Sequence, residues 1–103
     1  MLTKILLCIE PGAPTLDSAI PNSNTPGEVA VSWSPAFGST QDKYIVTYTG
    51  ASDIGSDTDE VLSTTTSKTY DLTAGHQYTF SVKAVSGTEE SADSNQITKG
   101  TCK

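Results

Sequence analysis

Apolar residues at every second position are the feature that most constrains how this chain folds. Tyr78, Phe80, Val82 and Ala84 stand at alternate positions, with short polar residues and one lysine between them. Because successive side chains of a β-strand point to opposite faces, this spacing gives a strand with one buried and one solvated face. An amphipathic helix needs apolar residues three and four positions apart, and that period is missing. The chain is therefore predicted to be built from half-buried strands.

Two more segments alternate in the same way, and weaker strand signals lie around them. The alternating apolar residues are Val29, Val31 and Trp33 in one segment and Tyr44, Val46 and Tyr48 in the other. The weaker strands are expected near residues 16–20, 60–63, 68–72 and 95–99. Turn-forming clusters separate these runs at intervals typical of a sandwich. Since half-buried strands need a second layer to cover their apolar faces, we predict an all-β fold of seven strands in two packed sheets.

Length and charge narrow the class of protein. A chain of 103 residues has the size of one domain. All six basic residues are lysine, the acidic residues number twelve, and the net charge is −6. This charge excludes nucleic-acid binding, because that affinity depends on basic side chains that neutralise phosphates. No apolar run approaches the roughly 20 residues of a membrane-spanning helix, so we expect a soluble domain that does not insert into a membrane.

Two longer stretches, VAVSWSPAFGSTQDKYIVTY and YDLTAGHQYTFSVKAVSG, resemble a fibronectin type III domain. The positions that match the family pattern are Pro14, Trp33, Tyr44, Val46, Tyr48, Leu72, Gly75 and Tyr78. The resemblance covers residues 11 to about 100 and implies an immunoglobulin-like, Greek-key β-sandwich of seven antiparallel strands. We expect this domain to occupy residues 11–103, with residues 1–10 as a leader, a remnant or an extension. Ala74 stands where the family usually has proline, which loosens the turn before Tyr78 without changing its register.

The resemblance implies structural roles for five residues. Tyr78 follows Leu72 and Gly75 at the spacing of a tyrosine corner, in which the ring fills the core edge and the hydroxyl bonds to the chain upstream. The alternative for Tyr78 is a core aromatic residue with a solvated hydroxyl. Trp33 ends an alternating apolar face, so core packing is favoured over stacking against a sugar or a ligand cation. Tyr44 belongs to the same predicted core.

Catalysis and cofactor binding find little support in the sequence. His76 is the only histidine, and no Gly-x-Ser-x-Gly motif fixes a nucleophile. One histidine with Cys8 and Cys102 does not supply the four ligands of a structural zinc site. We therefore expect no enzyme activity, no cofactor and no metal.

The acidic run SDIGSDTDE is expected to be a solvated loop. Its carboxylates belong to Asp53, Asp57, Asp59 and Glu60. Carboxylate oxygens are ligands that Ca²⁺ prefers, but the spacing departs from that of an EF-hand loop. Charge runs in loops usually face water, so a solvated loop is favoured over a calcium site.

Cys8 and Cys102 are not expected to pair within one chain. In the family fold the two termini leave at opposite poles, whereas a disulfide needs Cα atoms within about 7 Å. Whether the two cysteines are free or pair between chains stays open.

Two predicted loops supply candidate contact residues. The loop 86–95 offers Glu89, Glu90 and Asp93 to a basic protein partner, although such acids also serve only to keep a loop soluble. Phe37 lies in the loop 34–42, where we expect it to be buried, and an exposed Phe37 would be a contact candidate. The chain has no arginine, so the Arg-Gly-Asp tripeptide by which related domains bind integrins is absent.

These observations predict a binding module rather than an enzyme. We expect a non-catalytic extracellular domain, secreted or part of a membrane protein's ectodomain, that binds a protein partner in cell adhesion or as part of a receptor. The alternative is a passive spacer in a secreted multidomain enzyme or a receptor array. The isolated domain is expected to be a monomer. The identity of the partner and of neighbouring domains is open.

Overall fold

The computed structural model describes residues 11–38, 40–50 and 55–102, and all regular elements within them are strands. They are β1 (Thr15–Pro21), β2 (Glu28–Ser34), β3 (Lys43–Thr49), β4 (Ser56–Leu62), β5 (Ser67–Asp71), β6 (Gln77–Ser86), β7 (Glu89–Glu90) and β8 (Ile97–Gly100). Within this part of the chain no helix is long and apolar enough to cross a membrane.

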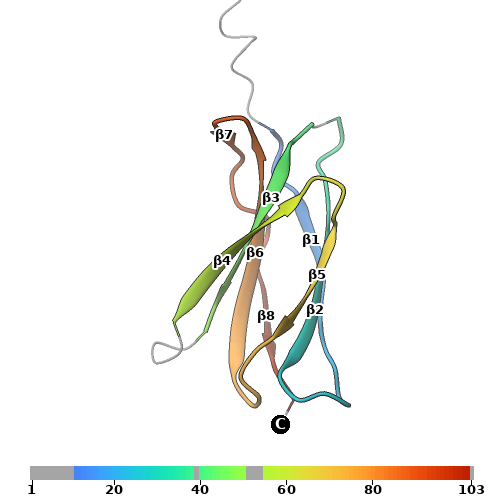
Figure 1. Ribbon diagram of the computed structural model, residues 1–103, viewed down its shortest axis with the longest axis vertical. Helices are drawn as coiled ribbons and strands as arrows, with labels where there is room; N and C mark the ends of the chain where they lie inside the picture. The colour runs from blue at the N-terminus through green and yellow to red at the C-terminus, as the bar shows by residue number, and fades with distance from the viewer. Residues whose placement is uncertain (1–10, 39, 51–54, 103) are drawn as a thin grey trace, which may run out of the picture.

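The strands form two antiparallel sheets that pack face to face (Figure 1). One sheet has three strands in the order β1, β2, β5. In the second sheet, of five strands, β4, β3 and β6 are neighbours, and β7 and β8 both pair with β6. The chain changes sheet between β2 and β3, between β4 and β5, and between β5 and β6. The predicted all-β sandwich of Greek-key type is confirmed.

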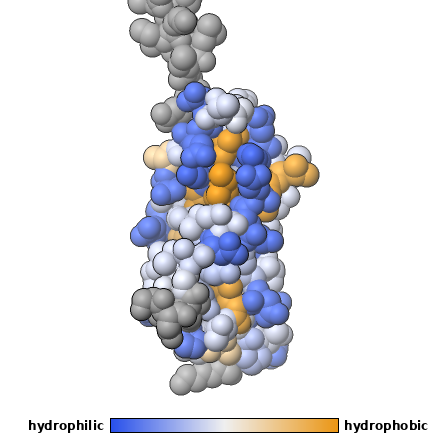
Figure 2. Space-filling model, turned by 60° about the vertical axis from the view of Figure 1, so that its left-hand side comes forward, coloured by the Kyte–Doolittle hydropathy of each residue, from blue (hydrophilic) through white to orange (hydrophobic). Residues whose placement is uncertain are grey.

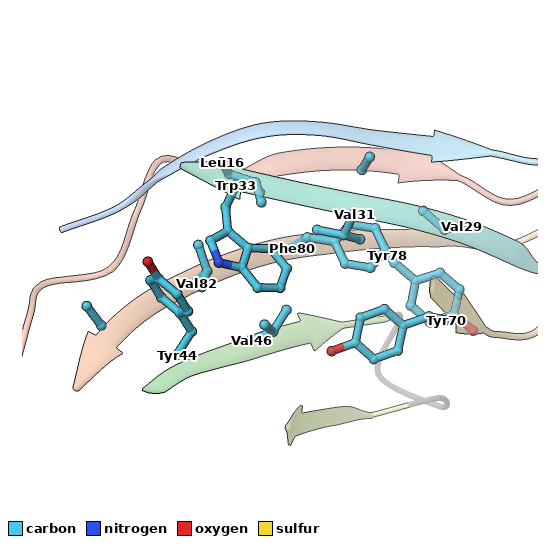
Figure 3. Close-up of a cluster of buried hydrophobic side chains, with 12 residues drawn as sticks. Leu16, Val29, Val31, Trp33, Tyr44, Val46, Tyr70, Tyr78, Phe80 and Val82 are labelled. Carbon is cyan, nitrogen blue, oxygen red and sulfur yellow. The ribbon is translucent and has the colours of Figure 1, made fainter. Parts of the chain in front are cut away.

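The alternating apolar residues of the sequence meet between the two sheets (Figure 3). The ring of Trp33 on β2 lies edge-on to that of Tyr44 on β3, with centroids 5.7 Å apart. The buried core consists of Leu16, Ala19, Val29, Val31, Trp33, Tyr44, Val46, Tyr70, Tyr78, Phe80, Val82 and Ala84. Burial of every second residue on three strands is the arrangement that the sequence pattern predicts.

The last strand was predicted over residues 95–99, and in the structure it is β8, Ile97–Gly100, preceded by the short strand β7. The segment 91–96, between β7 and β8, forms no regular strand. In this segment the hydroxyls of Ser91 and Ser94 accept hydrogen bonds from the N–H groups of Ala84 and Val82, at 2.8 and 2.9 Å. Both serines are buried. Their side chains therefore satisfy backbone groups of β6 that a continuous strand would otherwise pair.

The strand β4 begins earlier than predicted. Residues 56–59 were expected to belong to a solvated loop, but they pair with β3, and the ladder runs from Ser56 opposite Thr49 to Leu62 opposite Lys43. Aspartate has a low strand propensity, and pairing with an apolar, aromatic neighbour outweighs it. Asp53, of the same acidic run, lies outside the described residues.

An asparagine joins β1 to the segment before β8. The side-chain oxygen of Asn95 accepts a hydrogen bond from the N–H of Leu16 at 2.8 Å. The side-chain nitrogen of Asn95 donates to the carbonyl oxygen of the same residue at 3.1 Å. The amide group therefore acts as a short substitute for a neighbouring strand and ties the two sheets together at their edge.

The sandwich has two distinct ends (Figure 1). The loop end carries the loops 35–42 and 63–66 and the turn 87–88. The corner end carries the loops 22–27 and 72–76. The first described residues lie at the loop end, and the C-terminus lies at the corner end.

The cysteine prediction stays untested. Cys102 is half-buried near the C-terminus at the corner end. Cys8, with the rest of residues 1–10, lies outside the described residues, so its pairing and the role of that segment stay predictions.

Candidate protein-binding surface

Asp42 holds the loops of the loop end together. Its N–H donates to the carbonyl oxygen of Val85, and its carboxylate accepts a hydrogen bond from the N–H of Gly87, both at 2.7 Å. Its carbonyl oxygen accepts from the N–H of Ser63 at 3.2 Å. One residue thus joins the loop before β3 to the turn after β6 and to the loop after β4. Sequence reasoning missed Asp42, because a single aspartate before a strand resembles any solvated loop residue.

Phe37 projects into solvent, and the expectation that it is buried is wrong. The relative exposure of its side chain is 106%, that of a fully exposed residue. Phe37 lies in a turn with Gly38, whose φ of 76° is in the left-handed region. The core below this end is already filled by the rings of Trp33 and Tyr44. The turn therefore carries Phe37 outward as a candidate contact residue.

A second apolar side chain is exposed at the same end. Leu62 ends β4, beside the loop 63–66, and its relative exposure is 71%. Figure 2 shows hydrophobic side chains in a narrow stripe between hydrophilic ones on one face of the molecule, and no broad apolar area on that face. Sequence analysis did not single out Leu62, because its position in a strand favoured burial.

The three predicted acidic contact residues differ in their surroundings. Glu90 on β7 forms an ion pair with Lys83 on β6, with Nζ and Oε1 2.7 Å apart. The hydrogen bond that Lys83 donates to Glu90 raises the pKa of Lys83 above its usual value, and the charge of Asp93 acts in the same direction. Glu89 and Asp93 are exposed. The negative charge that remains for a basic partner therefore belongs mainly to Glu89 and Asp93.

The corner end contains the hydrogen bond that the sequence predicts for Tyr78. The side chain of Tyr78 is buried, and its hydroxyl oxygen accepts a hydrogen bond from the N–H of Thr73 at 3.1 Å. Leu72 packs against the core, and Gly75 has a φ of 76° in the turn that follows. These positions have the geometry of a tyrosine corner.

Thr101 reinforces the same turn and was missed by sequence reasoning. Its hydroxyl donates to the carbonyl oxygen of Thr73 at 2.7 Å and accepts from the N–H of His76 at 3.0 Å. The side chain lies just after β8 and is buried. A threonine three residues from the end of the chain gives no sequence signal for such a contact.

Three buried polar groups have no hydrogen-bond partner among the described residues. They are the indole nitrogen of Trp33 and the hydroxyl oxygens of Tyr44 and Tyr70. Burial raises the pKa of Tyr44 above its usual value. Burial also raises the pKa of Tyr70, and the negative charge of Asp59 adds to the shift. Trp33 is 2% exposed, which places its ring in the core and away from any ligand in solution.

No metal cluster is found in residues 11–38, 40–50 and 55–102. No group of three or more His, Cys, Asp or Glu side chains in these ranges is placed to hold a metal ion. His76 is half-buried in the turn at the corner end, where its backbone bonds to Thr101. The loop end offers groups that can contact a partner, namely an exposed aromatic ring, an exposed leucine and carboxylates.

Comparison with known protein families identifies the family to which most of this chain is similar. The family model of the fibronectin type III domain matches residues 12–99. No curated protein matches the sequence.

Solved structures of several proteins share the fold. One third of the structure of the chicken CNTN1 FN1–FN3 domains superposes on this chain, with a TM-score of 0.78 and 21% identity, covering 91% of this chain and 33% of that one. The FN5 domain of Drosophila Lar gives a TM-score of 0.73 and 20% identity, covering 90% and 98%. The β-1,2-glucanase of Parabacteroides distasonis gives a TM-score of 0.73 and 19% identity, covering 93% and 14%. At these identities the likeness concerns the fold alone.

Proposed function

The chain belongs to the fibronectin type III domain family, and on that premise we propose that it is an extracellular module that binds a protein partner through its loop end. Domains of this family are commonly extracellular adhesion or receptor domains and are generally non-catalytic scaffolds. The proposed role is that of an adhesion or receptor ectodomain module, secreted or attached to a membrane protein.

The full exposure of Phe37 is the observation that carries this proposal. An aromatic ring in water contributes nothing to the core, and aromatic residues are enriched where proteins contact each other. The neighbouring loops are held in place by Asp42, so less freedom is lost when a partner binds. Leu62 adds a second apolar contact at the same end.

The acidic residues near this end favour a partner with basic groups. Glu89 and Asp93 are exposed, and the chain as a whole has a net charge of −6. Charge of one sign around an apolar contact raises the rate of encounter with an oppositely charged surface. Glu90 contributes less, because Lys83 already offsets its charge.

A multivalent form of the domain, tested against a panel of purified extracellular proteins, checks the proposal. We expect Phe37→Ser to abolish binding to the partner found, since it removes the exposed ring. Ile20→Ser is the matched control, because Ile20 is 60% exposed near the corner end and its change removes a comparable apolar side chain. Binding that survives Phe37→Ser but is lost with Ile20→Ser would move the site to the other end.

The charge of the partner is tested separately. Glu89→Ser combined with Asp93→Ser is expected to slow association and to weaken its dependence on salt. If binding and its salt dependence are unchanged in this double variant, the partner is not basic at the point of contact.

A passive spacer is the second candidate, and two observations favour it. The described chain enters at one end of the sandwich and leaves at the other, which suits domains joined in a row (Figure 1). A region of the same fold occupies 14% of the chain of a β-1,2-glucanase. The sequence of the neighbouring domains distinguishes the candidates: a hydrolase beside this domain favours the spacer, and repeated modules with a membrane anchor favour adhesion.

The isolated domain is proposed to be a monomer. Acidic residues on the edge strand β4 repel a second copy, and this repulsion limits edge-to-edge pairing. Sedimentation of the purified domain under reducing conditions measures the mass, and a stable dimer would contradict the expectation.

A further inference from the structure

A cleft opens between the two sheets on the side where β4 and β5 form the sheet edges. Its volume is about 320 Å³, at the lower end of the range of ligand sites. It is lined by Tyr48, Ser56, Asp71, Leu72, Thr73 and Tyr78. The cleft lies at the corner end, away from Phe37 and Glu89, so it is a surface separate from the proposed partner contact.

Tyr48 is the tyrosine that gives this cleft accessible surface. Its ring is half-buried and lies edge-on to the rings of Tyr70 and Tyr78, with centroids 5.1 and 5.8 Å away, whereas Tyr78 is only 1% exposed. The tyrosine cluster already holds one cation, because the ammonium group of Lys68 lies 5.3 Å from the ring centroid of Tyr70. A positive charge at Tyr48 would have the same kind of neighbour.

Carboxylates flank the tyrosines on both sides. Asp71 ends β5 and lines the cleft, and Asp57 lies opposite Tyr48 on β4. Burial, with the nearby charges of Asp57 and Asp59, raises the pKa of Tyr48 above its usual value, so these carboxylates act on the tyrosine cluster. Lys68 is the basic residue that faces the same cluster, which leaves a surplus of negative charge.

The buried hydroxyl of Tyr70 shows that a further carboxylate lies on this side of the core. Tyr70 is 6% exposed, and burial together with the interaction with the Asp59 carboxylate raises the pKa of its hydroxyl. Asp59 therefore adds to the negative charge on the side that β4 borders.

The outer edge of β4 is free to pair with another strand. Within the described chain, β4 pairs along its whole length with β3 and has no neighbour on its other side. An edge of this kind presents backbone N–H and C=O groups to an extended peptide. Its acidic side chains disfavour a second copy of this chain and favour a basic segment.

We propose that the β4 edge and its cleft bind an extended basic peptide of a protein partner, which adds a strand to β4 and places an arginine side chain between Tyr48 and Asp71. The guanidinium group lies against Tyr48 and donates to the carboxylate of Asp71. The side chain fits the volume of the cleft, and the β-ladder fixes its position. This site is independent of the loop end, and its occupant is recognised by charge and backbone rather than by Phe37.

The test is an NMR titration of the intact chain with a short synthetic peptide in which arginine alternates with threonine. A peptide with glutamine at each arginine position is the control. We expect the arginine peptide to shift the signals of β4, Tyr48 and Asp71 and to slow hydrogen exchange of the outward amides of β4. The glutamine peptide should bind at least about tenfold more weakly, since it lacks the charge.

Two single variants locate the site. Asp71→Asn is expected to weaken binding of the arginine peptide about fivefold to tenfold, because it removes the carboxylate in the cleft. Asp17→Asn removes the same charge from an exposed residue on β1, at the opposite edge of the three-stranded sheet, and should leave the affinity within about twofold. A dispersed NMR spectrum of each variant shows that it is folded.

Three outcomes would overturn the proposal. Equal binding of the arginine and glutamine peptides would exclude recognition of the cation. Equal weakening by Asp71→Asn and Asp17→Asn would reduce the effect to general attraction by an acidic protein. Binding that leaves the β4 amides exchanging at their free rate would exclude strand addition. None of these results depends on whether Phe37 contacts a partner.

Discussion

The two ends of the sandwich are held by different kinds of interaction. At the corner end, the hydroxyls of Tyr78 and Thr101 bond to backbone groups of the turn 72–76, and both side chains are buried. At the loop end, the carboxylate of Asp42 joins the loops, and the side chain of Phe37 is left in water. One end is built from buried neutral contacts that favour stability, and the other displays side chains on a charged, solvated scaffold.

At the corner end two backbone segments approach so closely that one of them has no room for a side chain. The N–H of Leu72 donates to the carbonyl oxygen of Gly27 at 2.7 Å, and a Cβ atom on Gly27 would lie 2.1 Å from the carbonyl oxygen of Leu72. Around Gly38 at the loop end, a Cβ atom would meet nothing within 4 Å. The difference means that the loop end tolerates changes of sequence that the corner end does not.

The largest expected effect is that of Gly27→Ala. The φ of Gly27 is +90°, and the added methyl group would collide with the backbone of Leu72, so we expect a loss of about 3 to 4 kcal/mol in the free energy of unfolding. Gly38→Ala is the matched control, with a φ of +76° but open space, and should cost only about 1 kcal/mol. Urea unfolding of both variants measures this. Equal losses would show that the close approach at the corner end is unimportant.

The next effect compares two buried tyrosines. Tyr78→Phe leaves the N–H of Thr73 without its partner and is expected to cost about 1 to 3 kcal/mol. The hydroxyl of Tyr44 has no partner among the described residues, so Tyr44→Phe should change the stability by less than about 0.5 kcal/mol, or raise it. Thermal unfolding of the pair checks the assignment, and a Tyr78→Phe variant as stable as the parent would defeat the tyrosine corner.

The pH dependence of stability tests the buried tyrosine hydroxyls of Tyr44 and Tyr70. The buried hydroxyls of Tyr44 and Tyr70 have pKa values raised by burial, whereas an unfolded tyrosine ionises near pH 10. The folded state therefore holds more protons above pH 10, and stability is expected to fall there by up to about 1.4 kcal/mol per pH unit for each group. It is unaffected below that pH. Unfolding in urea between pH 8 and about pH 11 measures the slope. Tyr44→Phe combined with Tyr70→Phe should reduce the slope, and Tyr48 and Lys83, whose pKa values are also raised, account for what remains. An unchanged slope in the double variant would assign the loss to other groups.

Asp42→Ala is expected to have a smaller effect on stability and a local effect on motion. It removes an exposed but charge-assisted hydrogen bond to Gly87, at a cost of roughly 1 kcal/mol. Hydrogen exchange of the Gly87 amide should become faster, while that of the Thr73 amide at the corner end is unchanged. Faster exchange at both ends would mean that the two ends are not independent.

The smallest expected effect is that of Phe37→Ser. A side chain that is fully exposed in the folded state loses little by removal, so the free energy of unfolding should change by less than about 0.5 kcal/mol. A larger destabilisation, measured by urea unfolding, would show that Phe37 packs on the domain in solution and would weaken its role in binding.

The sequence predicted the two sheets of this fold because the buried face of each strand depends only on the spacing of neighbouring residues. Val29, Val31 and Trp33 must share one face of a strand whatever the rest of the chain does, and the structure buries all three. The predicted role of Tyr78 rested on the family spacing, and its hydroxyl lies where that spacing requires.

The features that the sequence did not predict depend on contacts between distant segments. Thr101 bonds to a turn 25 residues away or more, and Asp42 bonds to Gly87 across 45 positions. Phe37 was misplaced because its exposure depends on Trp33 and Tyr44 filling the core beneath it. Such outcomes follow from three-dimensional packing, which residue spacing along the chain does not encode.

The side chain of Asn95 has a mechanical consequence. Its amide spans the first strand and the segment leading to the last one, close to where tension between neighbouring domains would enter the sandwich. Force applied to the two ends of the chain pulls these segments in opposite directions, and the load on the first strand is shared by the two hydrogen bonds to Leu16 and by the ladder to β2. The amide is the part of this resistance that links the first strand to the other sheet, and its loss would release the first strand at lower force.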